Sequence, residues 1–89
     1  MTFQARLRKC MANGNLTVAD LARWFERPHP TMRSWVEDGV EPAGGPLDSA
    51  MVKATLNKLE KLIASNSKFP VPRLSPQKRI AYLKELRRE

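Results

Sequence analysis

The chain has 89 residues, of which 42% are hydrophobic and 28% charged, and its net charge is +7. This length allows one small domain with little stability in reserve, and the positive charge favours a polyanionic partner, either nucleic acid or a membrane surface. Because no apolar run reaches the roughly 20 residues that cross a bilayer, and the N-terminus lacks the apolar stretch of a signal peptide, we expect an intracellular protein with no membrane partner.

The positive charge is unevenly distributed along the chain. Residues 66–89 carry seven Lys and Arg residues against two acids, whereas residues 1–65 carry nine against seven. Cys10 is the only cysteine, so it cannot form an internal disulfide, and we expect it to be a small core side chain.

The helical spacing of Phe3, Leu7 and Cys10 predicts a first helix with Thr2 as its N-cap. Asn13-Gly14-Asn15 is expected to end this helix, because Gly and Asn tolerate the left-handed conformation. A second helix is expected to begin within a few residues of this end.

Thr17-Val18-Ala19-Asp20 resembles a capping box with Asp in the usual place of Glu, which predicts the start of a second helix. Glu26 to Pro30 is expected to form a turn, because its two prolines lack an N–H donor and restrict the residue before each. Pro30 suits the first turn of a third helix, which is expected to stop at Gly39.

A loop over residues 40–46 is expected to lead into a long amphipathic helix over about residues 47–65. Its apolar stripe consists of Leu47, Met51, Val52, Thr55, Leu56, Leu59, Leu62 and Ile63. Three prolines then indicate an extended arm, and Ser75-Pro76 is expected to cap a last helix from Gln77 to about Arg88. Since a helix this short is marginal alone, its apolar side is expected to dock on the chain's own domain or on a second subunit.

The stretch from Leu16 to Pro42 resembles the helix-turn-helix of lambda-repressor-like proteins, the Cro/repressor or XRE-type family. Ala22 stands where the two helices of that motif cross, and only a small side chain allows the approach. Leu21, Phe25, Met32 and Trp35 stand at its buried positions, and Glu37, Asp38 and Gly39 follow the tryptophan in the family's order.

The resemblance covers about residues 3–65 and implies an all-α fold, a compact five-helix domain within a DNA-binding domain 1–65. The basic arm and short helix expected at 66–89 lie outside it. Its expected core is Leu7, Leu16, Leu21, Ala22, Phe25, Met32, Trp35, Leu56 and Leu59. Trp24 is expected either to cover a neighbouring helix or to meet the tail. The chain departs from the family at Glu26, where the turn usually has Gly, and at Pro28 and Pro30, which remove side chains from places that often touch bases.

The implied function is that of a sequence-specific double-stranded DNA-binding protein, a small bacterial or phage transcriptional regulator in the cytoplasm of the cell or the infected host. The recognition helix, about Pro30–Asp38, is expected in the major groove. The expected DNA contacts are Thr17, Val18, His29, Thr31, Arg33, Ser34 and Glu37, and the expected phosphate contacts are Arg27, Lys78, Arg79, Arg87 and Arg88.

Several of these roles have a plainer alternative. Thr17 has two possible roles. It can cap the helix and nothing more, or it can both cap the helix and contact a phosphate at the helix N-terminus. Arg33 can read guanine with its two-pronged donor, or simply be solvated. Glu37 can accept from cytosine, or stay solvated.

Two other functions compete with transcriptional regulation. One is a protein-interaction module, such as an inhibitor, antitoxin or assembly adaptor, that reuses the fold. The other is an accessory protein of DNA packaging or recombination. A homodimer is expected through the arm and last helix, with a solvated, disordered tail as the alternative.

Catalysis is not expected. The sequence offers no histidine with a nucleophile and an orienting acid, and no glycine-rich phosphate loop. One His and one Cys cannot assemble a metal site within one chain. We therefore expect no metal, no cofactor and no small-molecule ligand.

Overall fold

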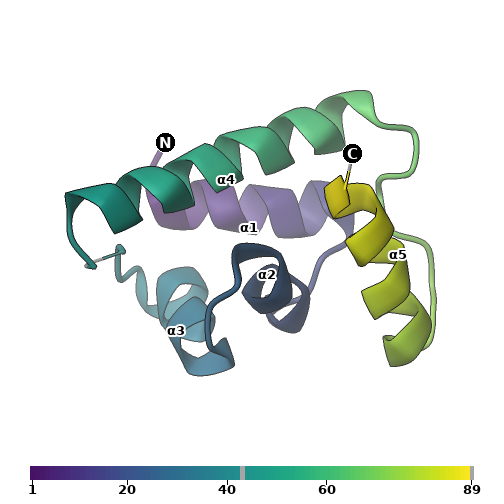
Figure 1. Cartoon of the computed structure of the whole chain (residues 1–89), viewed down its shortest axis with the longest axis horizontal. Coiled ribbons are helices and arrows are strands. Elements are labelled where there is room, and N and C mark those ends of the chain that lie inside the picture. The colour runs from purple at the N-terminus through teal and green to yellow at the C-terminus, as the bar shows by residue number, and fades with distance from the viewer. Residues whose placement is uncertain (43, 89) are drawn as a thin grey trace.

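The computed structural model describes residues 1–42 and 44–88, and its regular structure in those ranges is entirely helical (Figure 1). In chain order the helices are α1 (Phe3–Gly14), α2 (Val18–Phe25), α3 (His29–Arg33), η1 (Ser34–Asp38), α4 (Pro46–Ser65) and α5 (Pro76–Arg88). The expected all-α class is confirmed. None of the helices in the described ranges is both long enough and apolar enough to span a membrane.

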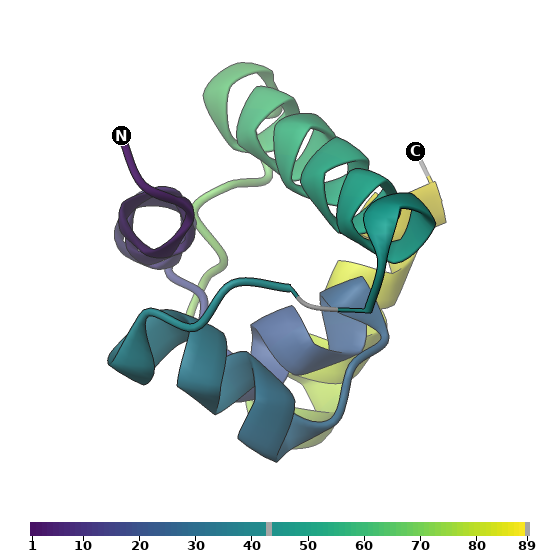
Figure 2. The ribbon, with the colours of Figure 1, turned by 90° about the vertical axis from the view of Figure 1, so that its left-hand side faces the viewer.

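The helices form two layers around one core. In Figure 1, α1 and α4 lie above α2 and α3, while α5 stands beside α2 and rises to the level of α1, so that α2 separates α3 from α5. Figure 2 shows α3 and η1 in front of α2, with α5 behind α2. The two surfaces of α2 are therefore covered by different parts of the chain.

The expectation of five helices within residues 3–65 is wrong. The described part of that range holds α1, α2, α3 with its π-helical continuation η1, and α4, while α5 belongs to the tail. Residues 39–42 and 44–45, which the structure describes between η1 and α4, form no helix, and three of them, Pro42, Gly44 and Gly45, are poor helix formers.

All nine side chains expected in the core are buried: Leu7, Leu16, Leu21, Ala22, Phe25, Met32, Trp35, Leu56 and Leu59. The tail adds Phe69, Val71, Leu83 and Leu86 to the same cluster. Trp24 is buried too, and its ring meets Phe69 edge-on with centroids 6.4 Å apart. The apolar side of the tail therefore docks on the chain's own body, which was one of the two surfaces expected for it.

Both ends of α1 follow the sequence signals. The hydroxyl of Thr2 accepts from the N–H of Ala5 at 3.1 Å. Asn15 takes the left-handed conformation, with φ 54°, and ends the helix. Its side-chain amide donates to the carbonyl of Val71 at 2.7 Å, while the N–H of Val71 donates to the carbonyl of Gly14 at 2.9 Å. The arm is thus hydrogen-bonded to the C-terminal end of α1.

The apolar stripe expected on α4 is only partly correct. Val52, Leu56 and Leu59 are buried, but Leu47 and Met51 are 84% and 66% exposed. At 100° per residue, the two exposed side chains lie about 100° or more around the helix axis from the buried row. Leu62 and Ile63 are half-buried and pack against the core, so the expected stripe fails only near the start of α4, at Leu47 and Met51.

Candidate functional site

A turn of three residues, Glu26–Pro28, joins α2 to α3. Glu26 has φ 55° and ψ 49°, so a non-glycine residue occupies the left-handed position of this turn. The N–H of Glu26 donates to the carbonyls of Ala22 and Arg23, and that of Arg27 donates to Ala22 at 2.9 Å. These bonds satisfy the last carbonyls of α2 and fix the direction in which the chain enters α3.

The helix after the turn has a buried side and an exposed side. It begins at His29, one residue earlier than expected, with Pro30 in its first turn, and η1 is π-helical, which the periodicity did not predict. Met32, Trp35 and Val36 are buried on its inner side. The remaining side chains of this helix face outward or are half-buried.

The seven side chains expected to contact DNA all reach the surface. Those of Thr17, His29, Arg33 and Glu37 are exposed, and those of Val18, Thr31 and Ser34 are half-buried. Arg33 Nε lies 4.0 Å from Glu37 Oε2. Because His29 to Asp38 carry one arginine against two acids, this surface is polar but not strongly basic.

Arg27, expected as a phosphate contact, instead connects the turn to α4. Its guanidinium donates to the carbonyls of Phe25 and Glu26, each at 3.2 Å, and to Asp48 Oδ1 at 2.6 Å. Asp48 lies in the first turn of α4. The described contacts of Arg27 are therefore structural.

The four basic side chains of α5 that were expected to contact phosphates differ in their exposure and in their ion pairs. Lys78 is exposed near the start of the helix. Arg79 is half-buried, with its side chain only 14% exposed. Arg87 pairs with Glu26 at 3.0 Å, and Arg88 pairs with Glu85 at 3.5 Å. Three of the four thus remain at the surface, and Arg79 does not.

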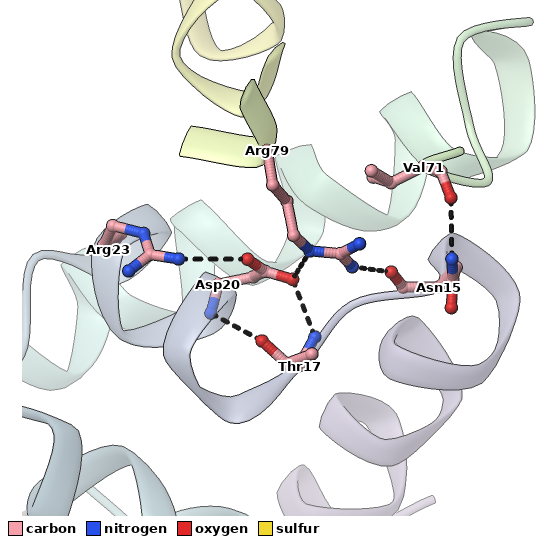
Figure 3. Close-up of polar contacts among 6 residues, drawn as sticks. All are labelled: Asn15, Thr17, Asp20, Arg23, Val71 and Arg79. Atoms are coloured by element: carbon pink, nitrogen blue, oxygen red, sulfur yellow. Dashed lines mark hydrogen bonds and ion pairs between the residues drawn. The ribbon is translucent and has the colours of Figure 1, made fainter. Parts of the chain in front are cut away.

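Arg79 belongs to a buried polar cluster, shown in Figure 3. Asp20, which is 1% exposed, accepts through Oδ2 from Arg79 Nε at 2.6 Å and from the backbone N–H of Thr17 at 2.8 Å. Its Oδ1 accepts from Arg23 Nη2 at 3.3 Å, and Arg79 Nη2 donates to the carbonyl of Asn15. Within one cluster, the start of α5 is fixed to the start of α2.

The predicted capping box accounts for half of this cluster. The hydroxyl of Thr17 accepts from the N–H of Asp20 at 3.1 Å, and the carboxylate of Asp20 accepts in return. The sequence did not indicate that Arg79 would supply the second partner. Nothing local to Arg79 could have signalled it, because the two residues are 59 positions apart.

A second set of contacts that the sequence did not predict supports the end of η1. Gln4 Nε2 donates to the carbonyl of Val36 at 2.9 Å, and Arg8 Nε donates to the same oxygen at 3.0 Å. Gln4 also reaches the carbonyl of Glu37 at 3.3 Å. Carbonyls in the last turn of a helix lack helical partners, so two side chains of α1 take their place and orient the exposed helix.

Three other titratable side chains are structural. Cys10 is buried, and burial raises the pKa of its thiol to about 11. Arg6 forms two hydrogen bonds to the Glu60 carboxylate, at 3.0 and 2.6 Å, which lower the pKa of that carboxyl. Among the described residues, no cluster of three or more His, Cys, Asp and Glu side chains is arranged to hold a metal ion.

Comparison of the chain with models of protein families, with curated proteins and with solved structures gave no match. The function of the surface formed by α2, α3 and η1 is therefore inferred from the residues that compose it. Its most informative features are the buried inner side, the left-handed turn and the polar outer side.

Proposed function

We propose that the chain is a sequence-specific double-stranded DNA-binding protein, a small bacterial or phage transcriptional regulator. In this proposal α2, the turn and α3 with η1 act as a lambda-repressor-like helix-turn-helix, and residues 29–38 enter the major groove. The observation that carries the proposal is the sorting of side chains in this unit. Ala22, Phe25, Met32 and Trp35 are buried, while every side chain at a position matched to a DNA contact reaches the surface.

Arg33 is the side chain best suited to read a base. Its guanidinium can donate two parallel hydrogen bonds to O6 and N7 of guanine. Its 4.0 Å separation from Glu37 is the limit of an ion pair, and both side chains are more than half exposed, so the pairing costs little to break. Glu37 can then accept from a cytosine amino group or disfavour misplaced phosphates.

Phosphate contacts are proposed at the start of α2. Thr17 already accepts a backbone hydrogen bond through its hydroxyl oxygen, and its proton stays available to donate to a phosphate. The helix N-terminus behind it favours an anion. The Asp20–Arg79 pair fixes the start of α5 beside the start of α2. The exposed Lys78 ammonium can therefore contact the same stretch of DNA sugar-phosphate backbone as Thr17.

Homodimerisation through the tail remains part of the proposal, since paired half-sites about one helical turn apart multiply specificity. Phe69, Val71, Leu83 and Leu86 are committed to the chain's own core. Ile80, which is 40% exposed, is the apolar side chain of α5 left for a partner subunit to reach. Sedimentation equilibrium of the full chain tests this part, and a monomeric mass at micromolar concentration would remove it alone.

The second candidate is a protein-interaction module built on the same helices. Leu47 and Met51 favour it, because they are one helical turn apart on α4 and largely exposed. The near-neutral charge of residues 29–38 also favours it, since nucleic-acid surfaces are usually more basic.

Selection from a library of random duplexes, followed by titration in several salt concentrations, separates these functions. A regulator should enrich one site and bind it at least about 10³-fold more tightly than random duplex. Equal affinity for selected and random duplexes would favour the packaging or recombination role. Binding to neither at low salt would refute the DNA proposal and leave the protein-interaction module.

A further inference from the structure

A pocket of about 190 Å³ lies between α2 and α5, on the side of α2 that faces away from α3. Its lining residues are Asp20, Arg23, Trp24, Ile80, Leu83, Lys84 and Arg87. None of these is among the side chains proposed to enter the major groove. The pocket is therefore separate from the surface proposed to enter the major groove, and Arg87 is the one lining residue that was also expected to contact a phosphate.

The lining divides into an apolar floor and a basic rim. Trp24 and Leu83 are buried and form the floor with Ile80, whose side chain remains partly exposed. Arg23 and Arg87 are 45% and 42% exposed at the rim, where the exposed Lys84 adds a third cation. A large apolar group can thus enter the pocket while anions attached to it meet the rim.

The acidic groups near the pocket are already engaged. The carboxylate of Asp20 is buried and accepts from Thr17, Arg79 and Arg23. Glu26, outside the lining, pairs with Arg87. Against these two carboxylates stand four cations, Arg23, Arg79, Lys84 and Arg87, so the rim keeps an excess of positive charge that is complementary to an acidic ligand.

The size of the pocket favours one of two classes of ligand. Small-molecule sites usually enclose about 300–1,000 Å³, more than this pocket offers. A volume of about 190 Å³ instead suits one large side chain, of the kind that anchors a protein interface in a pocket.

We propose that this pocket binds an acidic segment of a partner protein, in which one large apolar side chain is flanked by carboxylates. The apolar side chain lies on Trp24 and Leu83, and the carboxylates pair with Arg23, Lys84 and Arg87. This site goes beyond the proposed DNA-binding function and does not depend on it, but it uses Ile80 and would therefore compete with a dimer formed through that side chain. A regulator with both sites would hold a duplex on one side of α2 and a protein on the other.

The test uses isotope-labelled full-length chain and three synthetic pentapeptides. The first has phenylalanine between two pairs of glutamates, the second replaces that phenylalanine by alanine, and the third replaces the glutamates by glutamines. The first peptide should shift the backbone amide signals of residues 23–24 and 80–87 in a saturable way. The alanine and glutamine peptides should each bind at least about fivefold more weakly, because each lacks one of the two contributions.

Matched variants locate the site. Lys84→Glu should weaken binding of the first peptide by about fivefold or more, and Ile80→Ala should weaken it to a smaller degree. Lys61→Glu makes the same charge change on an exposed side chain of α4, outside the pocket, and should alter the affinity less than about twofold. Circular dichroism checks that each variant is folded.

Three outcomes would overturn the proposal. The first is no saturable shift of these signals at millimolar peptide. The second is equal binding of the alanine peptide, which would mean general attraction between charges. The third is displacement of the shifts by a short DNA duplex bound at the same signals, which would make the surface a nucleic-acid site. Because the duplex titration is measured separately, failure of the peptide leaves the DNA proposal untouched.

Discussion

Arg79 Nε donates to Asp20 Oδ2 across 2.6 Å and joins two helices whose residues are 59 positions apart. Asp20 also closes the capping box at the start of α2, so one buried carboxylate serves both the local helix and the long-range contact. The segment that begins the proposed helix-turn-helix therefore depends on the tail for its stability.

Asp20→Ala should lower the free energy of unfolding by about 3 kcal/mol, because it leaves Arg79 half-buried without its partner and removes the Asp20 half of the capping box. Urea denaturation followed by circular dichroism measures this loss. Asp38→Ala, which removes an exposed carboxylate instead, should change the stability by less than about 0.5 kcal/mol. Similar effects of the two substitutions would mean that the buried pair contributes little.

The left-handed turn residue can be tested by comparing two variants with each other. Glu26→Gly should be more stable than Glu26→Ala by about 1 kcal/mol, since both lose the ion pair to Arg87 and only alanine keeps a Cβ atom at positive φ. Thermal and urea unfolding give the difference. Equal stabilities would show that Glu26 carries no backbone strain in solution.

Arg33→Ala should weaken binding to a selected duplex by about 1–3 kcal/mol and relax the preference at one base pair, because it removes the guanidinium proposed to read guanine. The exposed Lys53 on α4 provides the control, and Lys53→Ala should leave the base preference unchanged. Titrations against duplexes mutated at each position measure both effects. If affinity and preference survive the loss of Arg33, the helix at residues 29–38 does not lie in the groove as proposed.

Deleting residues 66–89 should unfold the chain, because the deletion removes Phe69, Val71, Leu83 and Leu86 from the core and uncovers Trp24. A point substitution is therefore the better probe of phosphate contacts by the tail. Lys78→Ala should reduce the slope of log affinity against log salt by about 0.9 if its ammonium neutralises one phosphate. An unchanged slope would remove Lys78 from the interface, and a cooperatively folded truncated chain would contradict the role of the tail in the core.

Cys10 should react slowly with a thiol reagent, since only the thiolate reacts and its folded-state pKa is about 11. Burial keeps the Cys10 thiol protonated below its pKa. The reaction rate should therefore rise about tenfold per pH unit between pH 7 and 10, as the thiolate fraction does. Compared with the urea-unfolded chain at pH 8, the folded chain should react at least about 100-fold more slowly. Comparable rates in the two states would show that the thiol is accessible.

The sequence by itself determined the local elements. Helix caps at Thr2 and Thr17, the stop at Gly39 and the nine core side chains were predictable, because capping and hydrophobic spacing act over three or four residues. The sequence also predicted which side chains of the α2–α3 unit reach the surface. It did not predict that η1 is π-helical, and it overstated the buried face of α4.

Only the tertiary structure decided the partners of the charged groups. Arg27 and Arg79 looked like phosphate contacts in the sequence, yet Arg27 binds Asp48 and Arg79 binds Asp20. The same holds for Gln4, which supports the end of η1, and for the tail, which packs against Trp24 through Phe69. The physical reason is that an ion pair or a packed ring has no periodicity along the chain: it depends on which surfaces the folded helices bring together.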